Sequence, residues 1–555
     1  MISDNTKNTI KQFLKKGYLL SPDFFETYNE IYDNENFLNI ILEKTHNKEK
    51  PLIINKDLLA FFRNNGPAID INWNEFEKSK VLVERGKDYR LYKIFLDILN
   101  YSSSEDKKEQ LNSLLNEVRQ PDDNQILILE EEPTNENNVI ILKSYSDTYK
   151  KRTAQDFVYY YINRYEAIKK ILLNRVELQN ITSISRILNK NNKEEVSIIG
   201  IVSDKSISKN DNVKLVVEDL TGKINLLINK NKAELYEKAK DITLDEVMGI
   251  NGVVGNKVIF VNNLFFPDIS FNTKLKKSNN EAYVAFISDL HVGSRLFLRQ
   301  EFLKFIDWIN GKFGNNTQKE IASKVKYLFI VGDLVDGVGV YPGQEKELEI
   351  IDIFDQYKEC ANLLKKIRSD VKIIVCGGQH DAIRLSEPQP PLDKFYSGPF
   401  YEIPNIIPVS NPAVVNIHSS KDFEGFNVLM YHGASFHYYI SNIDSLRYNN
   451  THNTPHNVLH YLLQKRHLAP THASTVYIPD ANEDPLVIDR IPDIFVCGEM
   501  HRSDIAQYNS IITINCSCWQ AKTDFQEKIG NNPDPAKVPL LNLKTREIKI
   551  LKFSD

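Results

Sequence analysis

Side chains that can bind metal ions follow apolar runs at five places in the second half of the chain. In each place, a run typical of a buried strand ends at a glycine or a turn, and a carboxylate, an imidazole or an amide follows. The candidate residues are Asp289 and His291, Asp333 and Asp336, Gln379, His380 and Asp381, His432, and Glu499 and His501. One such place alone would be an ordinary polar loop, but five in one domain predict a metal site.

Strand ends should bring these side chains together, because α/β folds bind ligands at the carboxyl ends of their strands. Asp289 and His291 are two residues apart, so on an extended strand end both would point to the same side. Asp333 is placed to bridge two cations, and Asp336 is placed to orient a ligand. Two cations about 4 Å apart can clamp a phosphate ester and activate water. His380 is the candidate acid for the leaving group.

The composition also places the chemistry in the second half of the chain. Eleven of the twelve histidines follow residue 281, and only His46 precedes it. The net charge of −5 argues against a protein that coats DNA by itself, but it does not exclude DNA as a substrate. No apolar run approaches the ~20 residues of a membrane helix, and the N-terminus lacks an apolar signal core. We therefore expect a cytoplasmic protein with no membrane partner.

A length of 555 residues predicts several domains, and the patterns along the chain predict an α+β multidomain fold. The expected segments are a helical N-terminal domain at 1–100, a flexible linker at 101–140, a helical connector at 141–190, an OB-fold β-barrel at 191–275 and an α/β metallophosphoesterase domain at 281–555.

Residues 194–270 have the order of an OB-fold barrel, which is three strands, a helix and two further strands. Such barrels bind single-stranded nucleic acid or dock other proteins. The sequence has no clear interleaving of aromatic and basic residues, so both functions stay open. Residues 153–176 show helical spacing, and we interpret their aromatic face as core packing rather than as a surface for base stacking.

The order of the motifs resembles the calcineurin-like phosphoesterase superfamily, whose domain is a β-sandwich flanked by helices. The motifs are D-x-H, G-D-x-x-D, G-x-H-D, a single histidine, and G-x-x-H. Longer segments are similar to the small subunits of archaeal family-D DNA polymerases. They are VYPGQE, HDAIRLSEPQPPL, VSNPAVVNIH, LMYHGASF, LQKRHLAPTH and CWQAKTDFQ. The resemblance is dense from about residue 281 onward, looser from about 140 to 280 and weakest before 100.

This resemblance implies a 3′→5′ exonuclease that proofreads in partnership with a large polymerase subunit. It implies two divalent metal ions, with Mn²⁺ expected and Mg²⁺, Zn²⁺ or Fe²⁺ as alternatives. It also implies single-stranded DNA 3′ ends as substrate, with a sliding clamp or other replication factors as further candidate partners. By this resemblance, one metal ion would be bound by Asp289, His291 and His501, and the second by Gln379, His432 and Glu499, with Asp333 as the bridge. His380 would be the acid, and Asp336 and Asp381 would take part in catalysis beside it. Arg384 would bind the substrate.

Two residues depart from the pattern of the superfamily, and both fall on the second metal. Gln379 stands where asparagine is usual, and Glu499 stands where histidine is usual. Both can still bind a metal ion, although a carboxylate adds negative charge and should weaken the nucleophile. Our hypothesis is that the pair is compensatory and that the second site is retuned rather than lost.

Three functions compete at this point. The first is an active exonuclease subunit, and the second is a scaffold whose nuclease has decayed. The polar character of both substitutes favours activity, because decay is expected to replace ligands with apolar residues. The third is a free-standing phosphatase, which the polymerase-subunit segments argue against.

Overall fold

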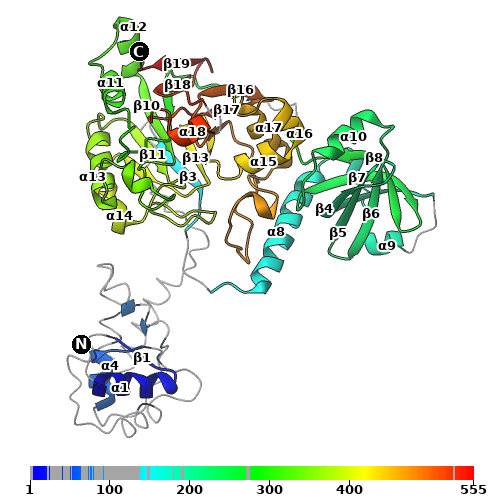
Figure 1. The fold of residues 1–555 in the computed structure, drawn as a ribbon, viewed down its shortest axis with the longest axis horizontal. Helices are drawn as coiled ribbons and strands as arrows, with labels where there is room; N and C mark the ends of the chain where they lie inside the picture. The colour runs from blue at the N-terminus through cyan, green and yellow to red at the C-terminus, as the bar shows by residue number, and fades with distance from the viewer. Residues whose placement is uncertain are drawn as a thin grey trace. The chain divides into compact units, whose positions relative to one another are not determined.

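The computed structural model describes most of the chain from residue 138 onward and parts of the chain before it. The described ranges are 4–21, 53–63, 138–146, 151–178, 180–188, 193–269, 275–528 and 532–554, with single positions between 24 and 95. The linker expected at 101–140 lies outside the described residues except for its last three positions. The chain divides into two compact units, residues 1–125 and 126–555 (Figure 1).

The first unit contains two described helices and a short parallel strand pair. They are α1 (Asp4–Lys15), β1 (Leu19–Leu20), β2 (Ile53–Ile54) and α4 (Lys56–Arg63). Phe13 on α1 and Leu58 on α4 are fully buried. Both of these helices of the predicted helical domain therefore pack an apolar side chain inward.

The second unit contains a closed five-stranded barrel, which precedes most of the sandwich strands in the chain. Its elements are β4 (Glu195–Ile207), β5 (Val213–Asp219), β6 (Gly222–Ile228), α10 (Ala233–Lys240), β7 (Val247–Gly255) and β8 (Val258–Phe265), with strand order β4-β5-β6-β8-β7. The predicted order of three strands, a helix and two strands is confirmed. Closure leaves no open sheet edge in the barrel.

Two six-stranded sheets follow the barrel. The first is β12 (Ile406–Pro408), β11 (Lys372–Cys376), β10 (Val325–Val331), β9 (Tyr283–Ile287), β18 (Lys537–Asn542) and β19 (Ile548–Lys552), in that order. The second is β16 (Asp504–Tyr508), β17 (Ile511–Asn515), β15 (Ile494–Cys497), β14 (Phe426–Tyr431), β13 (Ala413–Ser419) and β3 (Asn138–Ser144). Strand β3 falls where the sequence predicts the linker and the connector, but this segment pairs antiparallel with β13 as an edge strand.

Helices cover the outer faces of both sheets. Beside the first sheet are α11 (Arg299–Ile309), α12 (Asn316–Ser323), α13 (Ile353–Leu364) and α14 (Lys394–Tyr401), and beside the second are α15 (Phe436–Asn442), α16 (Asp444–Tyr448) and α17 (His456–Lys465). The remaining elements are α8 (Ala154–Leu172), α9 (Ile184–Leu188), α18 (Asp524–Lys528), η1 (Val176–Leu178), η2 (Gln344–Lys346) and η3 (His472–Ser474). No helix among the described residues is both long enough and apolar enough for a membrane crossing.

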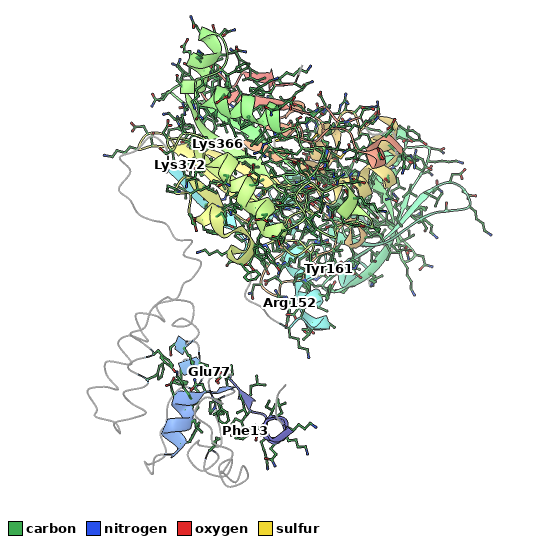
Figure 2. All side chains as sticks on the ribbon, turned by 60° about the vertical axis from the view of Figure 1, so that its left-hand side comes forward. Phe13, Glu77, Arg152, Tyr161, Lys366 and Lys372 are labelled. Carbon is green, nitrogen blue, oxygen red and sulfur yellow. The ribbon has the colours of Figure 1, made fainter. Side chains whose placement is uncertain are left out.

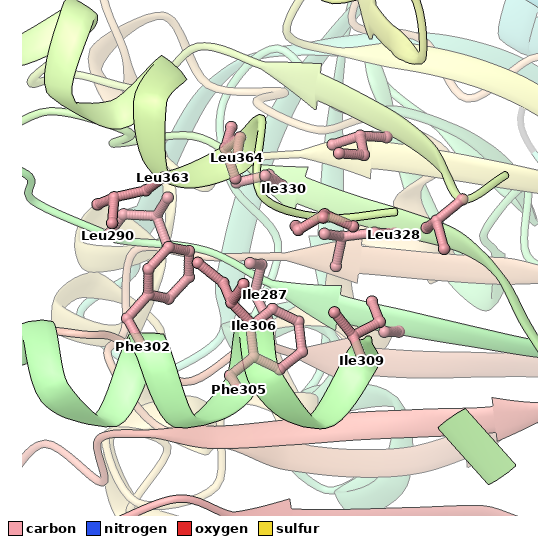
Figure 3. Packing of buried hydrophobic residues seen from close by; sticks show 14 of the residues in the cluster. Ile287, Leu290, Phe302, Phe305, Ile306, Ile309, Leu328, Ile330, Leu363 and Leu364 are labelled. Carbon is pink, nitrogen blue, oxygen red and sulfur yellow. The ribbon is translucent and has the colours of Figure 1, made fainter. Parts of the chain in front are cut away.

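Alternation along the central strands divides the core into layers. In β9, Ala285 and Ile287 face the helices, while Val284 and Phe286 face the other sheet. Because side chains of a strand alternate between its faces, a strand with both faces covered is apolar throughout. Figure 3 shows side chains of α11, including Phe305, pointing from the helix toward the strands. The result is a β-sandwich flanked by helices, with the strand ends fixed on both sides.

Helix α8 lies against both the barrel and the loops of the sandwich. Tyr161, labelled in Figure 2, shares a hydrogen bond of 2.7 Å with the hydroxyl of Tyr477. Arg164 is fully buried and donates to Asp484 at 2.6 Å. His467 contacts the same carboxylate oxygen through Nε2 at 2.8 Å. A buried ion pair is stable only when its remaining polar atoms are satisfied, and this cluster meets that condition.

We expect this cluster to make the protein less stable in mild acid. Burial, followed by the charge of Arg164, lowers the pKa of His467 from its usual 6.5 to about 4. The unfolded chain therefore binds a proton that the folded chain does not, and stability falls as the pH drops from about 6.5 toward 4. The predicted contribution is about 2 kcal/mol between pH 7.5 and pH 5. The free energy of unfolding of wild type and of His467→Gln at both pH values measures it. Equal pH dependence in the two proteins would contradict the prediction.

Candidate metal centre

All of the predicted ligands follow the carboxyl ends of strands, but the strands belong to both sheets. The loops after β9, β10 and β11 come from the first sheet, and the loops after β14 and β15 come from the second. The residues on these loops are Asp289 and His291, Asp333, Gln379 and His380, His432, and Glu499 and His501. Within each sheet, the strands that carry them run parallel to one another, so their carboxyl ends lie at the same edge of that sheet.

Five of these residues adopt left-handed backbone conformations. The φ angles are 52° at Asp289, 51° at His291, 50° at Asp333, 70° at Glu499 and 54° at His501. Such conformations are costly for residues with a Cβ atom and cluster at functional sites. Asp289 and His291 do converge, but the prediction that an extended strand end aligns them is wrong. Strand β9 ends at Ile287, and sharp turns after it aim both side chains.

Three groups of side chains place their ligand atoms within 4.8 Å of one another. They are Asp289 with His291 and His501, Asp289 with Asp333 and His432, and His291 with Asp333 and His380. Because these groups share members, they form one continuous site. All of these residues are buried apart from His380, which is partly buried.

Two imidazole rings face each other in the first group. Nε2 of His291 lies 3.3 Å from Nε2 of His501, which in turn lies 3.3 Å from Oδ1 of Asp289. The other ring nitrogen of His291 lies 3.1 Å from Asp336. Burial lowers the pKa of His291, which favours the neutral ring. A neutral ring that donates from Nδ1 to Asp336 presents the lone pair of Nε2 to the site, as a metal ligand does.

His432 has the same arrangement in the second group. Its Nδ1 lies 2.8 Å from the carbonyl of Val331 and can donate to it. Nε2 then lies 3.2 Å from Asp333 and 3.2 Å from Glu499. A neutral ring would present a lone pair to two carboxylates, which is unfavourable unless a cation or a proton lies between them.

Three buried atoms of the site have no hydrogen-bond partner in the part of the chain that the structure describes. They are Oδ1 of Asp289, Oε1 of Gln379 and Nε2 of His432. Buried polar atoms are nearly always hydrogen-bonded, so three such atoms in one site favour a bound ligand. Carboxylate, amide and imidazole donors suit divalent transition metals. The residues present therefore fit a metal centre.

Charges around the site shift its carboxylates toward their ionised forms. Burial alone would raise the pKa of Asp333, but His432, His380 and His291 together outweigh burial and hold this pKa well below its usual range. Burial likewise opposes ionisation of Glu499, and contacts with His432 and His437 reverse the effect and lower its pKa. The site thus holds carboxylates that are stable only beside positive charge.

Two glycines allow the loops to approach the ligands closely. A Cβ atom on Gly378 would lie 2.2 Å from Oδ1 of Asp333, and one on Gly332 would lie 2.3 Å from Nδ1 of His432. Gly332 also has a φ of 81°, which L side chains rarely adopt. The glycines before the predicted ligands are thus required by the geometry of the site.

Asp336 and Asp381 lie behind the ligands. Asp336 contacts His291 and accepts hydrogen bonds from Gln344 and Gln520. Asp381 accepts from the backbone of Gly378 at 2.9 Å and from the hydroxyl of Tyr357 at 3.1 Å. Both carboxylates therefore hold loops and rings in place, and for Asp336 this agrees with the orienting position expected from the sequence. The catalytic role that the resemblance implies for both stays a prediction.

Arg384 is engaged by its own loop. Its guanidinium donates to the carbonyls of Ser386 and Pro388 and lies 5.4 Å from the ring centroid of Tyr145. These contacts stabilise the turn, so the arginine expected to bind substrate also has a structural role.

Three further residues, which the sequence did not predict, contact the candidate ligands or Asp336 behind them. Nε2 of His437 lies 3.2 Å from Glu499, Gln526 lies 2.9 Å from Nδ1 of His501, and Gln520 contacts Asp336. None of them directly follows a strand, so the pattern of an apolar strand followed by a polar side chain does not identify them. The available signal is their place in or beside the segments that resemble the family: Gln520 and Gln526 lie within CWQAKTDFQ, and His437 directly follows LMYHGASF.

Comparisons with known proteins identify the family. The family described as the B subunit of DNA polymerases alpha and epsilon matches residues 284–505. The chain is 37% identical over 399 residues to the DNA polymerase II small subunit of Methanothermobacter thermautotrophicus, and the match covers 72% of this chain and 79% of that protein. The chain belongs to the archaeal DNA polymerase II small subunits.

A second member of the family shows that lengths vary. The DNA polymerase II small subunit of Pyrococcus abyssi is 37% identical over 418 residues, and the match covers 75% of this chain but only 64% of that protein. Among solved structures, an archaeal phosphodiesterase aligns over 48% of this chain and 98% of its own, with 13% identity and a TM-score of 0.25, which is too low to establish a shared fold.

The glycine geometry predicts that Gly378→Ala weakens metal binding at this site. The added Cβ atom would displace Asp333, which two of the three ligand groups share. We expect Mn²⁺ affinity, measured by calorimetry on the full chain, to fall at least tenfold, as removal of a supporting contact does. Gly398→Ala is the matched control, because nothing lies within 4 Å of its Cβ position. Equal affinities of the two variants would contradict this account of the loop.

Proposed function

We propose that this DNA polymerase II small subunit is a metal-dependent 3′→5′ exonuclease that proofreads newly made DNA. The observation that carries the proposal is the set of buried side-chain atoms without a hydrogen bond on Asp289, Gln379 and His432, which can each bind a metal ion. These atoms lie among loops that have the motif order of phosphoesterases. A scaffold would gain nothing from keeping such atoms buried and unsatisfied, since each is a cost to stability.

The ligand groups support two adjacent metal ions, with Mn²⁺ as the expected species. Asp289, His291 and His501 would hold one ion, Gln379, His432 and Glu499 would hold the other, and Asp333 would bridge them. Two divalent ions supply Lewis acidity toward a phosphodiester and toward water.

His380 would act as the general acid. Its Nδ1 lies 2.7 Å from the carbonyl of Asp336 and can donate to it, which leaves Nε2 for the substrate. Burial disfavours protonation of this ring, but the charges of Asp333 and Asp336 outweigh burial and raise its pKa. His380 is thereby suited to give a proton to the 3′ oxygen that leaves when the terminal nucleotide is released.

Gln379 and Glu499, which depart from the superfamily pattern, are the reason for a competing proposal. In that proposal the nuclease is inactive and the chain only assembles the polymerase. Glu499 adds a negative charge, and Gln379 reaches the site through one more methylene than asparagine does. Both nevertheless keep an oxygen available, and Glu499 contacts His432. Oxygen-rich sites favour Mn²⁺ or Mg²⁺ over Zn²⁺, so the pair supports a retuned metal preference.

The remaining proposals concern partners and domains. The relatives are small subunits by name, which supports a large polymerase subunit as partner. We propose that the barrel, with limits near 191–275, is an OB fold that binds single-stranded DNA or the large subunit. The domain from 281 onward would be the exonuclease, with a sliding clamp or another replication factor as a further partner. The complex would act in the cytoplasm.

The test is degradation of 5′-labelled single-stranded DNA with Mn²⁺, by the full chain alone and with the large subunit of the same organism. We expect stepwise shortening from the 3′ end. Asp333→Asn should reduce the rate by at least 10³-fold because it removes the proposed bridge, and His380→Ala by about 10²–10⁴-fold because it removes the acid.

The controls separate the competing functions. His456→Gln replaces a histidine that pairs with Asp504 away from the site, and it should leave the rate unchanged. A complex that forms with the large subunit but never shortens DNA would overturn the exonuclease and leave the scaffold. Hydrolysis of small phosphate esters without DNA cleavage would instead support a free-standing phosphatase.

A further inference from the structure

Glu499 is held between two imidazole rings. One carboxylate oxygen, Oε2, lies 3.2 Å from Nε2 of His432, and the other, Oε1, lies 3.2 Å from Nε2 of His437. The side chain of His437 is 46% exposed, against 17% for Glu499 and none for His432. The first contact is therefore on the side of the metal centre and the second on the side of the solvent. The carboxylate of Glu499 therefore lies between the buried site and the more exposed ring of His437.

The position of His437 is fixed by the helix that carries it. His437 lies in the first turn of α15, and its neighbours Phe436, Tyr439 and Ile440 are buried in the core beside the second sheet. Phe436 also packs close to Gly433, where an added Cβ atom would meet both Phe436 and Glu499. Since three buried side chains anchor this short helix, they fix the backbone position from which His437 contacts Glu499.

A carboxylate at position 499 needs such a donor more than an imidazole would. A glutamate side chain has more rotatable bonds than histidine, so one contact leaves it with several accessible conformations. A second contact to the other oxygen restricts the carboxylate to one orientation. Groups that hold a ligand in this way typically change metal affinity or activity by about 10–100-fold.

We propose that His437 is a positioning residue that orients Glu499 toward the second metal site, so that the pair Glu499–His437 replaces the single histidine usual at position 499. Nε2–H of His437 donates to Oε1 and leaves Oε2 beside His432. A ring protonated on Nε2 makes this contact whether or not Nδ1 also carries a proton. The inference rests on the proposed metal centre and deepens it.

The test is a double-mutant cycle on Mn²⁺ binding, measured by calorimetry on the full chain. His437→Ala should weaken the second Mn²⁺ by about 10–100-fold. His437→Gln keeps an N–H donor and should recover part of the loss. With Glu499→His in place, His437→Ala should cost nothing further, because the residue that it positions has been replaced. Asn442→Ala is the control, since Asn442 is exposed at the end of the same helix.

The outcomes separate this inference from the proposed function. An equal loss in both backgrounds, or no loss in either, would overturn the positioning role of His437. A chain that binds fewer than two Mn²⁺ ions would overturn it together with the second site. If the coupling between positions 437 and 499 is found but DNA is never shortened, the exonuclease proposal fails and this inference stands.

Discussion

Burial of several carboxylates beside one another is the constraint on which the rest of the structure depends. Asp289, Asp333 and Glu499 lie within contact distance of the same histidine, His432, and unpaired charges in a protein interior are costly. Among the described residues, Oδ1 of Asp289 and Nε2 of His432 have no hydrogen-bond partner. Positive charge at the centre makes this arrangement favourable, so the loops must hold these side chains against repulsion.

The backbone around the centre meets this demand in two ways. Left-handed turns at five ligand positions aim side chains that straight strands could not bring together. Glycines such as Gly378 let neighbouring loops approach without a collision. Behind them, Asp336 and Asp381 tie rings and backbone N–H groups in place. The sandwich supports all of these loops, because the strands that precede them are packed on both faces.

Patterns with a local cause could be predicted from the sequence. Apolar strands that end in glycine and a ligand have a clear signal, so the strand-end positions of Asp289, Asp333 and His432 and the order of the barrel strands were predicted. Features that depend on distant partners could not be. Strand β3 is separated from β13 by more than 260 residues. Asp381 turns toward Gly378 and Tyr357 rather than toward the site. His437 stands on a helix, where no motif marks it as a partner of Glu499.

The central claim is that these buried donors form a two-metal centre with Asp333 as the shared ligand. Electron paramagnetic resonance of the full chain with Mn²⁺, titrated from one to two ions, tests it most directly. We expect the spectrum of a single ion to give way to that of a magnetically coupled pair, and Asp333→Asn to remove the coupling. A spectrum of isolated ions at every Mn²⁺ concentration would contradict it.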